Sequence, residues 1–222
     1  MPKVKPLKFA GVFLVDNKIA TINLIPGKSV YGEKLIKMGK KEYREWIPFR
    51  SKPAAAIKKG LKTFPIKRGD KILYVGASFG TTCSHFSDII GKDGIIYAIE
   101  ISPRCMRELI TLSEVRKNIV PVLADARKPQ DYTWIEPVDI VYQDVAIPDQ
   151  SEVLIRNCQA FLKPKGFAMI AIKSRSIDVT VTPFEVYRRE IRKLGKHFKI
   201  AETVQLDPLE KDHLFALMQP KP

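Results

Sequence analysis

Residues 71–87 constrain the possible fold more than any other stretch of the chain. They comprise a short apolar run, a loop between two glycines and a group of hydroxyl side chains. Residues 72–75 have the length and the β-branched character of a buried strand in a parallel sheet. Gly76 and Gly80 permit a sharp turn, in which the backbone at Ala77 can approach a ligand closely. The pattern therefore predicts a strand, a turn and a helix, with a cofactor bound at the turn.

Hydroxyl side chains at Thr81, Thr82 and Ser84 follow this turn and can cap the helix. The first N–H groups of a helix have no partner within it, so they can bind a carboxylate or a phosphate. We therefore expect the cofactor to contact the two glycine-turn residues Gly76 and Ala77, together with Thr81 and Thr82.

The same turn also fits a second class of enzyme. Residues 76–80 read Gly-Ala-Ser-Phe-Gly, which matches the Gly-x-Ser-x-Gly turn around the nucleophile of α/β hydrolases. Asp144 and His213 follow Ser78 in the hydrolase order. A hydrolase also needs an oxyanion loop after an earlier strand, whereas this turn follows the first strand of the expected sheet. The turn by itself leaves both enzyme classes open.

The positive charge of the chain is concentrated near its N-terminus. The formal net charge is +14, and residues 1–68 contain 17 Lys or Arg against 4 Asp or Glu, whereas residues 69–222 contain 21 against 20. A lysine-rich thermophilic surface would also be rich in Glu, and residues 1–68 are not. This asymmetry is typical of proteins that bind a polyanion such as nucleic acid. A noncatalytic RNA-binding module is therefore a third alternative.

The composition predicts a folded protein in a reducing compartment. A chain of 222 residues that is 45% hydrophobic can bury one substantial core and carry a small appendage. The longest apolar run near its end, residues 167–172, is far shorter than the roughly 20 residues that a membrane span needs. Cys83, Cys105 and Cys158 are scattered and form no Cys-x-x-Cys pair, so we expect neither a metal site nor a disulfide.

The chain is expected to form two domains. Residues 1–50 predict a small, basic, β-rich N-terminal domain, with two strands inside residues 9–25. A helix from Lys52 to about Lys62, capped by the preceding serine, opens the second domain. Strands and helices alternate through the rest of this domain, residues 51–222, which predicts a doubly wound, mostly parallel α/β sheet.

The strands expected in this sheet end at charged residues. The strands and their end residues are 95–99 with Glu100, 119–124 with Asp125, 138–143 with Asp144, and 167–172 with Lys173. An open parallel sheet binds ligands beyond the carboxyl ends of its strands. A helix over residues 184–196 and a strand pair over 199–206 and 214–218 complete the chain. If the last strand runs antiparallel, His213 at its beginning lies at the same edge.

The acidic strand ends predict a site for an adenosine. Glu100 lies 24 residues after Gly76, close to the spacing at which an acidic residue binds the ribose hydroxyls of an adenosine. Asp125 can accept from the adenine amino group, and Ala126 leaves room for the ring. NAD and S-adenosylmethionine both fit. The turn lacks the Gly-x-Gly-x-x-Gly pattern that NAD sites favour, so we expect S-adenosylmethionine.

Four ionisable residues are expected beside the cofactor. They are Asp144, Lys173, His213 and, if the first helix packs over the sheet edge, Lys52. Methyl transfer to a hydroxyl requires that its proton be drawn away or its developing charge be stabilised. The lysines favour the alkoxide, Asp144 can orient a lysine or take the proton, and His213 can relay or position. The residues thus favour methyl transfer to a hydroxyl.

Several segments resemble the signature segments of the fibrillarin family, and the similarity extends from about Tyr43 to the end of the chain. The segments are residues 50–57, 80–82, 84–88, 125–127, 144–150 and 211–213. The resemblance implies a Rossmann-like, S-adenosylmethionine-dependent enzyme that works within a box C/D ribonucleoprotein. It would methylate the 2′-oxygen of ribose in rRNA, with tRNA as a second candidate substrate. It also implies a catalytic tetrad, formed here by Lys52, Asp144, Lys173 and His213.

The resemblance further implies cofactor contacts and partners. The contacts fall on Thr81, Thr82, Glu100, Ile101, Asp125, Ala126, Asp144, Val145, Ala146 and Ile147. The partners are a coiled-coil scaffold protein, a kink-turn-binding ribosomal-type protein, and a guide RNA that selects the target nucleotide by base pairing.

Three positions depart from the family pattern. Phe79 stands where a small residue is usual, Pro53 replaces a leucine, and Ile147 replaces a glutamine, which leaves only a backbone contact at Ile147. No Gly-Arg-rich tail precedes the domain. The chain therefore resembles archaeal members, and we expect a cytoplasmic location.

Overall fold

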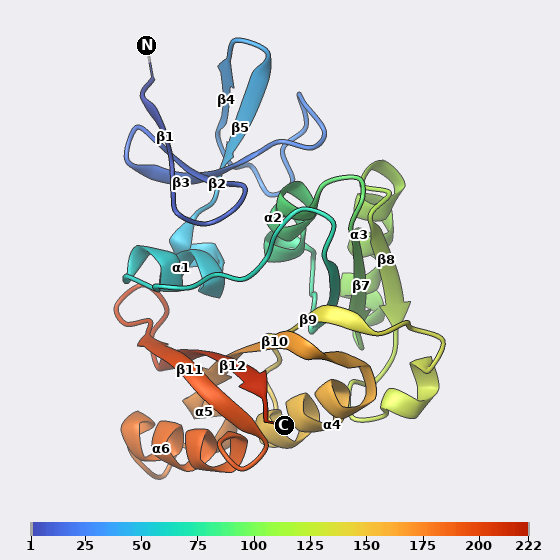
Figure 1. The fold of residues 1–222 in the computed structure, drawn as a ribbon, viewed down its shortest axis with the longest axis vertical. Coiled ribbons are helices and arrows are strands. Elements are labelled where there is room, and N and C mark those ends of the chain that lie inside the picture. The colour runs from blue at the N-terminus through green and yellow to red at the C-terminus, as the bar shows by residue number, and fades with distance from the viewer. Residues whose placement is uncertain (1, 222) are drawn as a thin grey trace.

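The computed structural model describes residues 2–221 and contains two β-sheets. The N-terminal sheet has the order β1-β2-β3-β5-β4, and all of its strand pairs are antiparallel. Its strands are β1 (Val4–Pro6), β2 (Val12–Val15), β3 (Lys18–Ile22), β4 (Leu35–Met38) and β5 (Lys41–Glu45). The expected small β-rich unit is therefore present, and Figure 1 shows it in blue above α1.

The second sheet has seven strands in the order β11-β12-β10-β9-β6-β7-β8. Its strands are β6 (Lys71–Val75), β7 (Ile95–Glu100), β8 (Ile119–Leu123), β9 (Val138–Gln143), β10 (Leu162–Lys173), β11 (Phe198–Gln205) and β12 (His213–Pro220). The five strands from β6 to β10 are parallel, whereas β12 is antiparallel to both β10 and β11. The predicted Rossmann-like sheet with an antiparallel last strand is confirmed.

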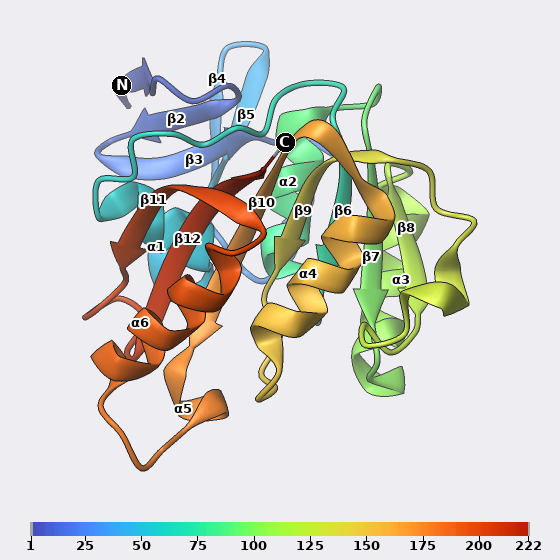
Figure 2. The ribbon, with the colours of Figure 1, turned by 60° about the horizontal axis from the view of Figure 1, so that its bottom comes forward.

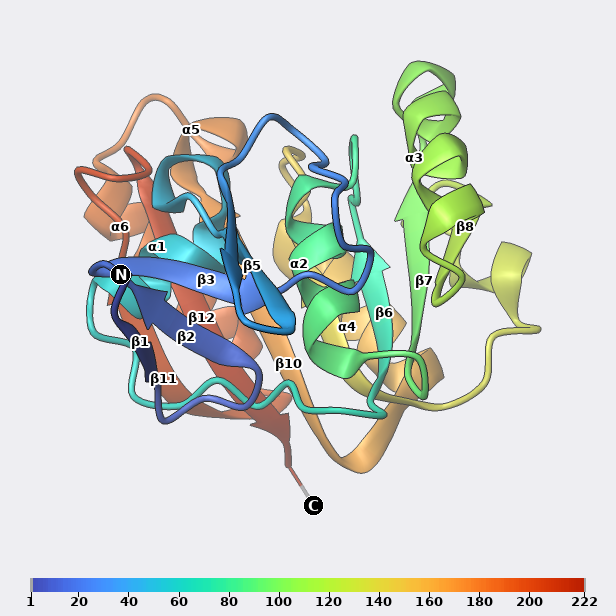
Figure 3. The same ribbon diagram turned by 90° about the horizontal axis from the view of Figure 1, so that it is seen from above.

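Helices cover both faces of this sheet. They are α1 (Lys52–Lys58), α2 (Thr81–Ile90), α3 (Pro103–Val115), α4 (Gln150–Phe161), α5 (Ser174–Ile177) and α6 (Pro183–Leu194), with 3-10 turns η1 (Pro48–Arg50) and η2 (Pro129–Tyr132). Helices α4 and α6 lie in front of the sheet in Figure 2, and α2 and α3 lie on the opposite face with the N-terminal sheet (Figure 3). Within residues 2–221, no helix is long and apolar enough to cross a membrane.

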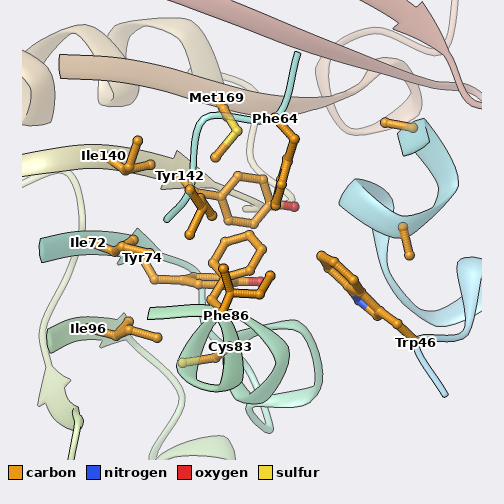
Figure 4. Packing of buried hydrophobic residues seen from close by; sticks show 14 of the residues in the cluster. Trp46, Phe64, Ile72, Tyr74, Cys83, Phe86, Ile96, Ile140, Tyr142 and Met169 are labelled. Carbon is orange, nitrogen blue, oxygen red and sulfur yellow. The ribbon is translucent and has the colours of Figure 1, made fainter. Parts of the chain in front are cut away.

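Alternation along β6 explains why the sheet needs cover on both faces. Successive side chains of a strand point to opposite faces. Accordingly, Ile72 and Tyr74 belong to the cluster under α1 and α2, whereas Leu73 and Val75 belong to the cluster under α4. Figure 4 shows the first cluster, in which the ring of Phe86 on α2 packs against the ring of Tyr74 at 5.6 Å between centroids.

The N-terminal sheet shares this first cluster with the seven-stranded sheet. Phe9, Val12, Ile19 and Trp46 are buried in it together with residues of β6 and α2. The indole of Trp46 lies 6.0 Å from the ring of Phe64, between ring centroids. The two sheets are therefore packed as one body, and the division of the chain at residue 50 stays a prediction.

Several predicted details were wrong. The first helix ends at Lys58 and not near Lys62, because the chain leaves helical geometry at Lys59 and Gly60 has a φ of +97°. Ser51 occupies the N-cap of α1 as predicted, but its side chain makes no capping hydrogen bond to the described residues of the helix. At α2 the predicted hydroxyl cap was wrong, because Gly80 occupies the N-cap. Strands β1, β4 and β5 were not predicted as strands, whereas β2 and β3 fall inside residues 9–25 as expected. Strand β10 begins five residues earlier than predicted, and the other predicted ends agree with the structure to within two residues.

A buried carboxylate joins the N-terminal sheet to α2 and α3. Asp88 Oδ2 accepts from Thr21 Oγ1 at 2.7 Å and from the Arg44 guanidinium at 2.8 Å. Its Oδ1 accepts from the Leu24 N–H at 2.9 Å and from the Arg116 guanidinium at 2.7 Å. The side chains of Asp88 and Arg44 are fully buried, and that of Arg116 nearly so. A carboxylate with four donors repays the cost of its desolvation, whereas an incomplete site would not.

We expect Asp88→Asn to destabilise the protein strongly. The amide keeps the shape but turns an N–H group toward a donor and removes the carboxylate that pairs with the buried Arg116, whereas Arg44 keeps its buried ion pair with Glu33. Breaking a buried pair in this way costs about 3–5 kcal/mol of unfolding free energy, measured by urea titration. The control is Asp93→Asn, which removes an exposed ion pair with Arg68 and should cost less than about 1 kcal/mol. Equal losses in the two variants would contradict this role for Asp88.

The buried imidazole of His85 makes stability depend on pH. His85 Nδ1 lies 2.8 Å from Thr21 Oγ1, and Nε2 lies 2.7 Å from the Tyr31 hydroxyl. Thr21 Oγ1 gives its own proton to Asp88, so it accepts from the Nδ1–H of a neutral ring. The Tyr31 hydroxyl has one proton, which His85 Nε2 shares with the Glu45 carbonyl oxygen at 3.0 Å. Burial, followed by the charges of Arg44 and Arg116, lowers the pKa of His85 well below its usual value.

We therefore expect stability to fall as the pH drops below about 6.5, where His85 of the unfolded chain takes up a proton that the folded chain does not. Urea titrations at pH values on both sides of this point measure the change. His85→Gln should show a smaller loss on acidification than the wild type. An unchanged pH dependence in that variant would show that other groups cause it.

Candidate functional site

The carboxyl ends of the parallel strands meet at one edge, where the chain order reverses between β6 and β9. A pocket of about 310 Å³ lies at this edge. It is lined by nine of the predicted cofactor residues, namely Gly76, Glu100, Ile101, Asp125, Ala126, Asp144, Val145, Ala146 and Ile147. The remaining three, Ala77, Thr81 and Thr82, line an adjoining pocket of about 200 Å³. The two pockets share the β6–α2 turn and the residues at the ends of β9 and β10.

Gly76 lets the ends of β6 and β9 approach each other. Its φ is +82°, and a Cβ added there would lie 2.7 Å from Val145 Cγ1 and 2.9 Å from the Asp144 carbonyl oxygen. A side chain at this position would therefore push against the backbone that carries Asp144. The sequence predicted that Gly76 lets a ligand approach the backbone closely. In the structure Gly76 also lets the ends of β6 and β9 lie close together.

Glu100 binds the backbone of the turn and of the segment after β7. The residue is 8% exposed. Its Oε2 accepts from the Ser78 N–H at 2.7 Å, and its Oε1 accepts from the Ser102 N–H at 2.8 Å. Each oxygen still has a second lone pair with which to accept from a ligand. Asp125 at the end of β8 is more accessible, and its Oδ1 accepts from the Arg127 N–H at 2.9 Å.

Two lysines flank Asp144 at the junction of the two pockets. Asp144 Oδ1 lies 2.9 Å from Lys173 Nζ, which also donates to the Asp144 carbonyl oxygen at 3.2 Å. Asp144 Oδ2 lies 3.8 Å from Lys52 Nζ. Lys52 comes from the first turn of α1, which packs against β12 (Figure 1). Helix α1 therefore packs over the sheet edge, as the predicted position of Lys52 requires.

His213 begins β12 and pairs in register with Lys173 on β10. Its Nδ1 lies 2.6 Å from the Lys211 carbonyl oxygen. Burial lowers the pKa of His213, and the charges of Lys52, Asp144 and Lys173 act on it as well. The antiparallel last strand thus brings the imidazole to the same edge as the other three groups, as predicted.

Sequence reasoning missed Glu210, an acidic neighbour of this cluster. Glu210 Oε1 lies 3.7 Å from Lys52 Nζ, so Lys52 lies between two carboxylates. Burial raises the pKa of Glu210, and Asp144 raises it further. The residue lies in the loop between β11 and β12, only three positions before His213, and that proximity was the one available signal. The lining residues Ser78, Ile99, Ala124 and Arg127 were also missed.

The hydrolase alternative is not supported by this geometry. Ser78 has a φ of +51°, and its hydroxyl lies 4.0 Å from Cys105 Sγ. Asp144 pairs with lysines, and within residues 2–221 no hydrogen bond joins Ser78 to His213 or His213 to Asp144. The three groups that a serine nucleophile needs are not arranged as a triad.

Comparison with known proteins identifies the family of the chain. The family model named fibrillarin matches residues 4–221. The chain belongs to the fibrillarin family. The match includes the N-terminal sheet, so the similarity extends further than the segment from Tyr43 that the sequence motifs indicated.

Three fibrillarins illustrate the relationship. The chain is 51% identical to the fibrillarin-like rRNA/tRNA 2′-O-methyltransferase of Pyrococcus furiosus, over 99% of this chain and 100% of the relative. The structure of Aeropyrum pernix fibrillarin with natively bound S-adenosyl-L-methionine superposes with a TM-score of 0.90, at 47% identity over 97% of both chains. Fibrillarin in a fibrillarin/Nop5p complex superposes with a TM-score of 0.89, at 42% identity over 98% of this chain and 100% of that chain.

We expect Gly76→Ala to destabilise the protein more than an alanine at another glycine with the same backbone angle. Gly69→Ala is the matched control, because its φ is +83° and no atom lies within 4 Å of an added Cβ. The control should show only backbone strain of about 1–3 kcal/mol. Gly76→Ala should lose about 1–3 kcal/mol more, since the added methyl overlaps the backbone at Asp144. Urea unfolding measures both, and equal losses would argue against the steric role of Gly76.

Proposed function

We propose that this protein transfers the methyl group of S-adenosylmethionine to the 2′-hydroxyl of ribose in rRNA, and in tRNA, at positions selected by a box C/D guide RNA. The relatives named as rRNA/tRNA 2′-O-methyltransferases support the reaction and its substrates. The observation that carries the proposal is the carboxylate of Asp144 between the ammonium groups of Lys173 and Lys52, at the mouth of a pocket beyond the parallel strands.

The residues of the pocket fit S-adenosylmethionine. Glu100 offers acceptor oxygens for the two ribose hydroxyls, and Asp125 offers one for the adenine amino group. Ala126 and Ile147 give apolar walls for the ring. Thr81 and Thr82, at the start of α2, lie where helix N–H groups can bind the methionine carboxylate. The Aeropyrum fibrillarin with its natively bound cofactor supports this assignment.

The remaining predicted contacts follow the ends of β6 and β9. We assign Gly76 and Ala77 to the side of the methionine, and Val145 and Ala146 to the floor of the pocket beside Asp144. Ile101 covers the adenosine from the end of β7. No metal is proposed in this mechanism.

Lys52, Asp144, Lys173 and His213 are the proposed catalytic residues. The bound cofactor supplies an electrophilic methyl group on its sulfonium. The two ammonium groups stabilise the negative charge that develops on the ribose oxygen, and Asp144 holds them in place. His213 is neutral near pH 7, because burial lowers its pKa. Its Nδ1–H donates to the Lys211 carbonyl, which leaves Nε2 as the nitrogen that takes the ribose proton.

The partners are also part of the proposal. The fibrillarin/Nop5p complex supports a coiled-coil scaffold protein as a partner of this chain. A kink-turn-binding ribosomal-type protein and a guide RNA would complete the particle, and base pairing would supply the sequence specificity. We place the particle in the cytoplasm of an archaeal cell, with residues 1–50 as its small basic domain and residues 51–222 as its catalytic domain.

Reconstitution with a guide RNA and its partner proteins tests the function. The wild type should transfer radiolabelled methyl from S-adenosylmethionine to one ribose of a complementary RNA. Lys173→Met should lower the rate by at least about a hundredfold, because it removes an ammonium group that stabilises the developing negative charge. Asp144→Asn should lower it by at least about a hundredfold as well, because the amide no longer pairs with the two lysines and so no longer holds them in place. Lys196→Met, an exposed lysine after α6, is the control and should keep the wild-type rate.

A thermal shift with added cofactor separates chemistry from folding. A variant that unfolds at a normal temperature, keeps its stabilisation by S-adenosylmethionine and has lost methyl transfer fits the proposed roles. Wild-type rates in the Asp144 and Lys173 variants would refute the catalytic assignment. A wild-type chain that binds RNA but gains no stability from the cofactor would favour the noncatalytic RNA-binding alternative.

A further inference from the structure

A second cavity, of about 570 Å³, lies between the N-terminal unit and α3. We call it the basic groove. The segment between β3 and β4 forms one wall, and it runs beside α2 in Figure 3. The other wall is the exposed side of α3, and the β6–α2 turn lies at the end. The basic and aromatic side chains that line the groove are Lys28, Tyr31, Arg50, Phe79, Arg104 and Arg107.

The charges of the groove are unbalanced. Lys28, Arg50, Arg104 and Arg107 contribute four cations, and Glu108 contributes one carboxylate. In the part of the chain that the structure describes, none of these four cations takes part in an ion pair. Other exposed cations of this chain, such as Arg68 and Arg127, do have carboxylate partners. Unpaired cations around one cavity attract a polyanion.

The groove opens toward the proposed reaction centre. Arg50, Phe79 and Thr81 line the groove and also the smaller pocket that contains Lys52 and Lys173. The guanidinium of Arg50 lies 5.1 Å from the ring centroid of Tyr31, so Tyr31 holds Arg50 at the boundary between the two. A ligand that extends from the lysines into the groove would pass the ring of Phe79, which is 45% exposed. Such exposure of a large apolar side chain suits contact with a sugar or a base.

We propose that the basic groove binds the ribose-phosphate backbone of the acceptor RNA next to the nucleotide that is methylated. Arg104 and Arg107, one turn apart on α3, contact phosphates, and Phe79 packs against the adjoining nucleotide. The inference rests on the function proposed above and adds the path of the substrate strand. We favour RNA over a protein partner because the groove continues into the pocket where the acceptor hydroxyl must lie.

The test removes the two arginines of α3 together. The double variant Arg104→Ala/Arg107→Ala should bind a short single-stranded RNA at least about tenfold more weakly, measured by fluorescence anisotropy. The slope of log affinity against log salt should also decrease, because fewer counterions are released when fewer phosphates are neutralised. The control Arg188→Ala/Arg192→Ala removes the same charge from exposed positions of α6, on the other face of the sheet, and should change little.

Phe79 supplies an independent variant. Phe79→Ala should weaken RNA binding about fivefold or more, whereas Phe79→Tyr should retain it, since base–aromatic stacking is lost only in the first. Stabilisation by S-adenosylmethionine and assembly with the scaffold protein should be unchanged in the double arginine variant, whose two side chains lie outside the cofactor pockets. Unchanged RNA affinity in the arginine and Phe79→Ala variants would overturn the proposal. Loss of scaffold assembly with normal RNA affinity would also overturn it, by assigning the groove to a protein.

The two proposals fail in different ways. If the wild type methylates RNA and the groove variants bind and methylate it normally, the groove assignment is wrong and the enzymatic function stands. If the groove variants lose RNA affinity but the wild type transfers no methyl group in the assembled particle, the chain binds RNA at the groove and the proposed reaction is wrong.

Discussion

The carboxylate of Asp88 holds the two sheets of this protein in one arrangement. It accepts from Thr21 on β3, from Leu24 just after it, from Arg44 on β5 and from Arg116 after α3. Each of these donors belongs to a different segment, so one buried charge sets the position of the N-terminal sheet, α2 and α3 together. Full pairing of the charge makes the burial tolerable, and any change that leaves one guanidinium unpaired is costly.

The reaction centre depends on that arrangement through a short chain of contacts. The indole N–H of Trp46 donates to Ser51 Oγ at 2.8 Å, and Thr82 Oγ1 donates to the same oxygen at 2.9 Å. Ser51 thereby connects the end of the N-terminal unit to the start of α2. Lys52 follows Ser51 directly, so its ammonium reaches Asp144 because α1 begins where this contact places it. The N-terminal unit thus positions a proposed catalytic group, and it also contributes Lys28 and Arg50 to the basic groove.

Opposite charges are used differently in the two regions. At the reaction centre two ammonium groups are matched by Asp144 and Glu210, which keeps the lysines in place near the pocket. In the basic groove the four cations lie at the surface and have no carboxylate partner among residues 2–221. A matched cluster positions groups for chemistry, whereas unmatched surface charge attracts a charged ligand from solution. The concentration of positive charge in residues 1–68 is consistent with this division.

The sequence by itself determined the order of strands and helices in the second domain and the residues at the strand ends. Glu100, Asp125, Asp144 and Lys173 could be placed at one edge because parallel strands present their carboxyl ends together. His213 could be added on the assumption of an antiparallel last strand. These inferences depend on local patterns and on a general rule of sheet topology, and both can be read without coordinates.

Only the tertiary structure decided the contacts that join distant segments. The approach of Lys52 depends on how α1 packs, Glu210 depends on the shape of a loop, and the pairing of Asp88 with Arg44 and Arg116 spans 44 and 28 residues. No periodicity in the sequence encodes such contacts, because they arise from the mutual burial of side chains whose partners lie far along the chain.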